Sequence, residues 1–99
     1  MDINVTTNGG ERVLALNGRL DTLTSSELQS PLTEAVETCE RTVLDFEELE
    51  YISSAGLRVL LLAEKAAKAA GSEFVVRNVS DEILEIFEMT GFSDILKIE

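Results

Sequence analysis

The sequence TVLDFEELEYISSAGLRVLLL, residues 42–62, joins an apolar strand to a long helix, and the rest of the chain is organised around this junction. The β-branched and aromatic run Thr42–Phe46 has the length of a strand. Helix-forming residues then occupy Ser54–Ala70, which is too long for a strand, and Gly71 suits a left-handed C-terminal cap. The glutamates within residues 47–50 predict an acidic loop between the strand and the helix.

Two serines stand where this helix begins. The hydroxyl of Ser53 or Ser54 can cap the helix by accepting a hydrogen bond from an unpaired amide of the first turn. A phosphate on either serine would also be favoured there, because free amides and the helix dipole both attract negative charge. Local chemistry alone favours the capping role and leaves the phosphorylated role open.

The N-terminal residues predict a β-hairpin. Ile3, Val5 and Thr7 alternate with polar residues, which is the two-residue period of a strand with one buried face. Asn8-Gly9 follows, and both residues tolerate the positive φ angles of a tight hairpin turn. Residues 12–17 then return as the paired strand, so the first two strands are expected to be antiparallel.

A helix is predicted after a connection at residues 18–23. Thr24 and Glu27 fit a capping box, in which each side chain bonds the other residue's amide. One apolar stripe at helical spacing then includes Leu28, Leu32, Ala35, Val36 and Cys39. Because Pro31 lacks an amide and crowds the preceding turn, we expect one helix that is kinked or loosened at that residue.

The C-terminal third predicts a strand, a helix and a final strand. Phe74–Val76 is typical of a buried strand, Ser80 suits a helix N-cap, and Gly91 ends that helix. Residues 95–98 are expected to form a short strand at the sheet edge. The alternation after the hairpin predicts an α/β fold with a mixed sheet of about four or five strands and about three helices, in a single domain spanning residues 1–99.

Composition excludes several classes of function. The chain has 19 acidic and 8 basic residues, a net charge of -11, so nucleic acid and anionic lipid would be repelled. No histidine is present, which removes the usual general base and the commonest metal ligand. The single cysteine suits a reducing compartment, and no signal segment or membrane-length apolar run is found. We therefore expect a cytoplasmic protein that binds other proteins, without cofactor or membrane insertion.

Two groups of residues could support a metal site or an enzyme site, but neither site is predicted. Glu47, Glu48 and Glu50 could bind a divalent cation, but glutamates that are close in sequence do not ensure that several oxygens converge in space. Asp45 near a strand end is the only feature of a phospho-accepting receiver enzyme, whose usual acidic pair after the first strand is missing. Neither a metal site nor an enzyme is therefore expected.

Three motifs resemble those of the STAS domains found in bacterial anti-sigma factor antagonists. Residues 51–57, YISSAGL, resemble the family signature of an aromatic and an apolar residue followed by Asp-Ser, a small residue, glycine and leucine. In that register Ser54 falls on the family's phosphorylated serine, whereas Ser53 stands where aspartate is usual and is a second candidate acceptor. Residues 18–21, GRLD, and residues 84–91, LEIFEMTG, are similar to a turn and to the final helix of the family.

The resemblance implies a phosphorylation-switched interaction module. Its partner would be an anti-sigma factor that is a serine kinase with a histidine-kinase-like ATPase fold, and a PP2C-like phosphatase would reverse the modification. The unphosphorylated protein would bind this partner and free a sigma factor for transcription. The helices of such domains tend to lie on one side of the sheet. The alternative is a STAS accessory subunit of a lipid-transport ATPase or another transporter.

Helical geometry predicts the recognition face. Residues seven apart lie almost above one another, so Ser54, Leu61 and Lys68 share a face that Arg58 and Lys65 complete. The residues expected to pack on the sheet instead are Val59, Leu62, Ala66 and Ala69 or Ala70. Leu61 is then an apolar exception on a polar face. It is either an isolated exposed leucine, which is common, or a partner contact.

Asp21 also has two roles that the sequence leaves open. By resemblance its loop borders the phosphorylation site, but aspartate is also common in turns because it bonds nearby backbone amides. The full set of candidate partner-contacting residues is Asp21, Ser53, Ser54, Gly56, Arg58 and Leu61.

Overall fold

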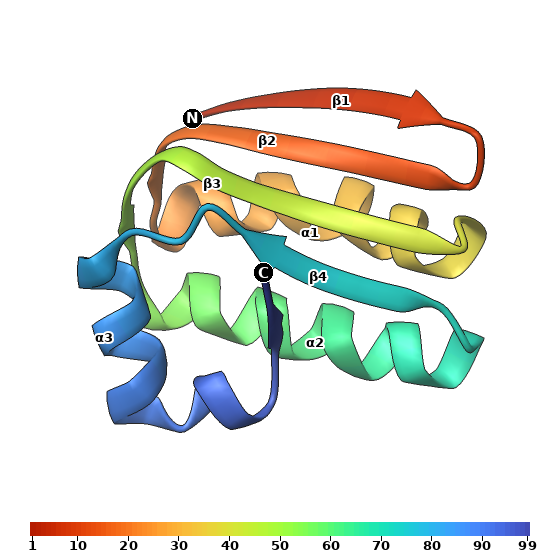
Figure 1. The fold of residues 1–99 in the computed structure, drawn as a ribbon. Coiled ribbons are helices and arrows are strands. Elements are labelled where there is room, and N and C mark those ends of the chain that lie inside the picture. The colour runs from red at the N-terminus through yellow and green to blue at the C-terminus, as the bar shows by residue number, and fades with distance from the viewer.

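The computed structural model describes all residues from Met1 to Glu99. Its elements in chain order are β1 (Asp2–Asn8), β2 (Glu11–Leu20), α1 (Thr22–Thr38), β3 (Arg41–Ile52), α2 (Ser54–Ala70), β4 (Glu73–Arg77), α3 (Asp81–Thr90), the 3₁₀ turn η1 (Phe92–Asp94) and β5 (Lys97–Ile98). The five strands form one sheet in the order β1-β2-β3-β4-β5, and the helices lie on one side of it (Figure 1). The predicted α/β class, with a mixed sheet and helices mainly on one side, is confirmed.

The hairpin and the parallel pairs follow the prediction, with the turn one residue later. β1 pairs with β2 antiparallel, and the other neighbouring strands are parallel. Asn8 is the last residue of β1 and pairs with Glu11, so the turn consists of Gly9 and Gly10. Gly9 has a φ of 63°, which a residue with a side chain seldom adopts.

Strand β3 is longer than predicted, because it continues through residues 47–50. The acidic loop predicted there is therefore wrong. β3 continues because β2 continues beside it, until Leu20 lies opposite Ile52. Leu49 is buried, while the glutamates around it lie exposed along the strand. Pairing with β2 and burial of Leu49 thus outweigh the low strand propensity of glutamate.

Helix α1 begins earlier than predicted. Residues 18–20 belong to β2 rather than to a connection, and Asp21 is the N-cap. The Asp21 carboxylate accepts hydrogen bonds from the amides of Leu23 and Thr24, each at 3.0 Å, and the Thr24 hydroxyl accepts one from the Asp21 amide at 2.8 Å. The bond from the Thr24 amide is the main reason that the pKa of Asp21 is lowered. The predicted capping box of Thr24 and Glu27 is therefore wrong, because the end of β2 decides where the helix starts.

The remaining helices and strands agree with the sequence in their essentials. α1 is one helix with Pro31 inside it. Ser80 caps α3, and Gly91 ends it with a φ of 83°. The last strand is shorter than the expected residues 95–98, because η1 precedes it and only Lys97–Ile98 pair with β4, at the sheet edge.

The buried face of α2 differs from the predicted one, although its bounds are as predicted. Its buried residues are Gly56, Leu57, Val59, Leu60, Ala63, Glu64 and Ala67. Val59 is buried and Ala66 half-buried, as expected, but Leu62 is 40% exposed and Ala69 and Ala70 are exposed too. The prediction is wrong for these three. Apolar residues surround most of this helix, so their period alone does not decide which arc faces the sheet.

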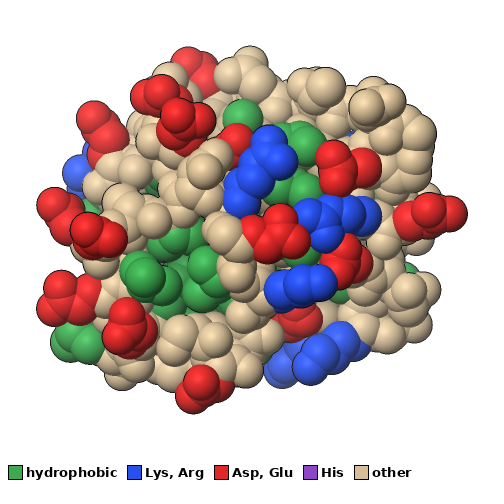
Figure 2. Space-filling model, viewed as in Figure 1, with side chains coloured by type: hydrophobic (Ala, Val, Ile, Leu, Met, Phe, Trp, Pro, Cys, Tyr) green, Lys and Arg blue, Asp and Glu red, His purple; other side chains and the backbone are tan.

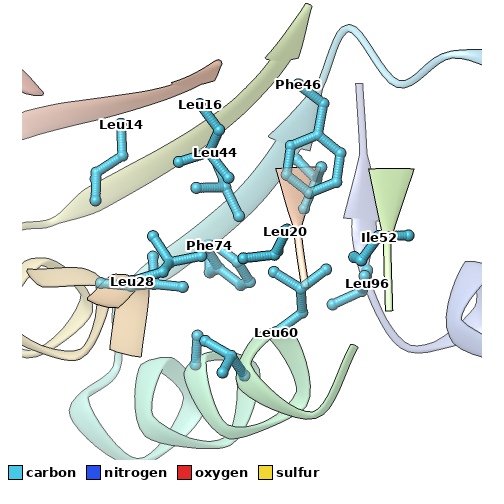
Figure 3. Packing of buried hydrophobic residues seen from close by; sticks show 14 of the residues in the cluster. Leu14, Leu16, Leu20, Leu28, Leu44, Phe46, Ile52, Leu60, Phe74 and Leu96 are labelled. Carbon is cyan, nitrogen blue, oxygen red and sulfur yellow. The ribbon is translucent and has the colours of Figure 1, made fainter. Parts of the chain in front are cut away.

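One apolar core lies between the sheet and the helices. Leucine and phenylalanine side chains from β2, β3 and β4 point towards α1 and α2, and meet side chains such as Leu28 and Leu60 (Figure 3). Phe87 joins α3 to this core, with its ring centroid 6.3 Å from that of Phe46 and 6.4 Å from that of Phe92. These contacts position β3 and α2, whose junction carries the serines.

The other face of the sheet is covered by charged side chains. Val43 and Val75 are fully buried although they alternate with the core residues of β3 and β4, so they lie on this face. Beside them Arg41 contacts Glu11 and Glu99, each at 2.9 Å. The whole ionic network consists of Arg41, Glu11, Glu73, Glu99 and Lys97. Figure 2 shows basic and acidic side chains alternating on the surface near the C-terminus.

Glu64 on α2 is a buried acid, and it predicts how stability depends on pH. It is 8% exposed, and this burial raises its pKa, opposed only by the charge of Lys68. A carboxyl whose pKa is higher in the folded state destabilises the fold once pH rises above its unfolded value of 4.5. Glu64→Gln is therefore expected to raise the free energy of unfolding at pH 7, and the gain should disappear below pH 4.5.

The measurement is urea unfolding at both pH values. The control is Glu85→Gln on α3, an exposed site that corrects for removing one negative charge from an acidic protein. An equal effect of the two variants at pH 7 would show that burial of Glu64 is not the cause.

Candidate functional site

Residues 18–21 meet the serine motif, residues 51–57, at the end of the β2-β3 pair. The Ser53 amide donates a hydrogen bond to the Leu20 carbonyl at 2.9 Å, directly after the register pair of Leu20 and Ile52. The guanidinium of Arg19 stacks on the Tyr51 ring, 4.2 Å from its centroid. The structure therefore brings the residue 18–21 segment beside the serine motif, and Asp21 both caps α1 and follows the residue that bonds Ser53.

The two serines have different environments. Ser53 is the N-cap of α2, and its hydroxyl oxygen accepts a hydrogen bond from the Gly56 amide at 3.2 Å. Ser54 is the first residue of the helix, is exposed, and makes no side-chain hydrogen bond. Ser53 is therefore engaged as a helix cap, whereas the Ser54 hydroxyl has no hydrogen-bond partner within the chain.

A cleft of about 770 Å³ opens between the N-terminal halves of α1 and α2, with Ser54 on its wall. The lining residues are Thr22, Ser25, Ser26, Gln29, Ser54, Ala55, Arg58, Val59 and Leu62. None of them is acidic, although 19 of the 99 residues in the chain are aspartate or glutamate, and Arg58 is the single basic residue among them. The cleft is thus a neutral to positive recess in a strongly negative protein.

Gly56 allows close packing of α2 on the strand ends and does not itself contact a partner. It is buried, and a Cβ atom there would lie 2.9 Å from Cγ of Leu20 and 2.9 Å from Cγ1 of Ile52. Only glycine allows the first turn of α2 to approach the end of the β2-β3 pair this closely. The residue therefore supports the shape of the site and offers no side chain to a partner.

Leu62, not Leu61, is the exposed leucine that borders the cleft. Leu62 follows Arg58 by one helical turn and lines the same cavity, whereas Leu61 is half-buried and does not line it. Leu62 could not be identified from the sequence, nor could the α1 residues on the opposite wall of the cleft. No signal in the sequence relates residues of α1 to residues of α2, because the pairing of two helices depends on how both pack on the sheet.

Asp45 was the one residue that suggested a receiver-like enzyme site. Its carboxylate is held by hydrogen bonds and an ion pair within the fold. Burial opposes its ionisation, but the amide of Glu47, the side chain of Asn78 at 3.1 Å and the guanidinium of Arg77 at 3.4 Å together lower its pKa. No group of three acidic, cysteine or histidine side chains is arranged to hold a metal ion. Asp45 thus stabilises the connection after β4, with no second acid beside it.

Comparison with known proteins identifies the class. The chain belongs to the STAS domain family, whose model matches residues 2–99. Its relatives place it with the anti-sigma factor antagonists, which are regulators rather than enzymes. BtrV of Bordetella bronchiseptica is 36% identical over 90 residues, which cover 90% of this chain and 78% of BtrV. The anti-sigma-B factor antagonist of Listeria monocytogenes is 36% identical over 84 residues, covering 83% of this chain and 73% of that protein.

A solved structure gives the same fold. The anti-sigma factor antagonist SpoIIAA in its unphosphorylated form matches with a TM-score of 0.79 at 16% identity, over 99% of this chain and 87% of that one. SpoIIAA of Bacillus has also been solved in its phosphorylated form, which matches with a TM-score of 0.78 at 17% identity, over 99% of this chain and 91% of that one. At this identity the likeness concerns the fold alone. No helix of the present structure is both long and apolar enough to cross a bilayer.

Proposed function

We propose that the protein is an anti-sigma factor antagonist controlled by phosphorylation of Ser54. In the cytoplasm, the unphosphorylated form binds an anti-sigma factor, which is a serine kinase with a histidine-kinase-like ATPase fold, and so releases a sigma factor for transcription. Transfer of a phosphoryl group to Ser54 ends this binding. A PP2C-like phosphatase removes the group and restores the active form.

The free, exposed hydroxyl of Ser54 is the observation that carries the proposal. Ser54 lies at the positive end of α2, where amides and the helix dipole favour a negative charge, so the helix tolerates a phosphate there. The added charge of about -2 is small against the net charge of -11 and does not unfold the protein. Phosphorylation therefore acts locally, on the surface that the partner covers. The existence of a phosphorylated form of SpoIIAA supports the same chemistry.

The proposed contact surface surrounds the cleft. Asp21 and Ser53 directly precede the lining residues Thr22 and Ser54 at the ends of β2 and β3, and Arg58 supplies the charged part of the rim. Leu62 supplies the apolar part, in the place that the sequence analysis gave to Leu61. Gly56 contributes by letting the strand ends and α2 come together.

Labelling by the kinase tests the acceptor. Radiolabelled ATP and the partner kinase, recovered by pull-down from native cytosol, are expected to label the wild type and Ser53→Ala but not Ser54→Ala. Ser53→Ala removes a helix cap at a cost of about 1 kcal/mol, so its fold is checked by circular dichroism. Full labelling of Ser54→Ala would move the acceptor to another residue. Recovery of a transport ATPase instead of a kinase would replace the sigma pathway with the transporter role.

A further inference from the structure

Arg58 is a cation without a counter-ion in a protein rich in acids. Six ion pairs engage the arginines Arg12, Arg41 and Arg77 and the lysine Lys97, but none includes Arg58. Arg19 stacks on a tyrosine. Arg58 is exposed, and the cleft that it lines contains hydroxyls, an amide and apolar groups but no carboxylate. An unpaired guanidinium above an acid-free recess is suited to an anion.

The position of Arg58 relative to Ser54 indicates which anion the guanidinium can bind. The two residues are four apart on α2, where side chains on one face are about 5 to 6 Å apart at Cβ. Long side chains on a helix tend to point back towards its N-terminus, so a guanidinium at position 58 can reach the turn that carries Ser54. Both residues line the same cleft. A phosphoryl group on Ser54 would therefore lie within reach of the Arg58 fork.

We infer that Arg58 binds the phosphoryl group of phosphorylated Ser54 in a pair within the same helix, beside the hydroxyl-lined cleft. This inference rests on the proposed modification of Ser54 and adds how the modified state is held. Phosphorylation then changes the contact surface in two ways. It adds negative charge at Ser54, and it makes the Arg58 guanidinium unavailable for contact with the partner. Arg58 acts as a positioning residue for the phosphate.

The test uses the full chain with phosphoserine installed at position 54 by genetic encoding, so the result does not depend on any kinase. The second pKa of the phosphate, ordinarily about 6, is followed by ³¹P NMR. It is expected to be lower by about 0.3 pH unit in the wild type than in Arg58→Gln, which is the size of an exposed i, i+4 ion pair. Arg58→Lys should lie between them, because lysine keeps the charge and loses the fork.

The matched control is Lys65→Gln, which removes the same charge from the same helix at a position about 16 Å from Ser54 along the helix axis. Its phosphate pKa should equal that of the wild type. Equal values in the wild type and Arg58→Gln, or an equal rise in Lys65→Gln, would overturn the inference. A movement of the Arg58 side-chain NMR signal when excess inorganic phosphate is added to unmodified protein, as large as that caused by phosphoserine, would assign the cleft to a free anion and overturn it too. Failure of kinase labelling would leave this pair intact, so the two proposals fail separately.

Discussion

Gly56→Ala is expected to lower the free energy of unfolding by about 1 to 2 kcal/mol. A Cβ atom at this position would lie 2.9 Å from Cγ of Leu20 and from Cγ1 of Ile52, closer than carbon atoms pack, and both neighbours are buried in the core. Overpacking of this kind costs about 1 to 3 kcal/mol. The better helix propensity of alanine offsets at most about 1 kcal/mol of this loss in stability. Urea unfolding followed by circular dichroism measures the net loss.

A double-mutant cycle identifies the clash as the cause. Two of the three atoms nearest to the added Cβ belong to Leu20, so Leu20→Ala makes room for it. Gly56→Ala should then cost much less, or stabilise, when it is introduced into the Leu20→Ala variant. If both backgrounds lose the same free energy, the tight approach of α2 to the strand ends is not what requires glycine. The N-cap of α2 would be affected by the same substitution, because the Gly56 amide donates the hydrogen bond that the Ser53 hydroxyl accepts.

Leu62→Ala is expected to weaken binding of the partner by about 1 to 2 kcal/mol, a factor of about 5 to 30. Leu62 is 40% exposed at the rim of the cleft, so a partner docked over Ser54 would bury most of its remaining apolar surface. The melting temperature should change little, since the side chain is only partly packed in the free protein. Isothermal titration calorimetry and thermal unfolding are measured on the same sample.

Leu61→Ala is the matched control, because it deletes the same atoms one position away. Leu61 is half-buried and lies outside the cleft, so its truncation should leave affinity nearly unchanged. An affinity loss confined to Leu61→Ala would restore the recognition face expected from helical geometry alone. No loss in either variant would remove this end of the cleft from the interface.

Features whose causes act within one or two turns of chain could be predicted from the sequence. The bounds of α2 follow from its N-terminal serines and from Gly71, and those of α3 from Ser80 and Gly91, because caps and left-handed glycines end helices locally. Alternation and a glycine turn were likewise enough for the antiparallel hairpin. The serine motif could be recognised as a candidate acceptor site through its resemblance to the family signature, since that signature consists of consecutive residues.

Tertiary structure alone decided where segments distant in the chain meet. Residues 47–50 are strand because β2 supplies hydrogen-bond partners that the local sequence cannot show, and Asp21 caps α1 because β2 ends at Leu20. The cleft exists because α1 and α2 pack side by side on the sheet, and that packing leaves Leu62 in solvent while it buries Leu60. Each of these outcomes depends on pairing or burial summed over several elements, so periodicity within a single segment could not determine it.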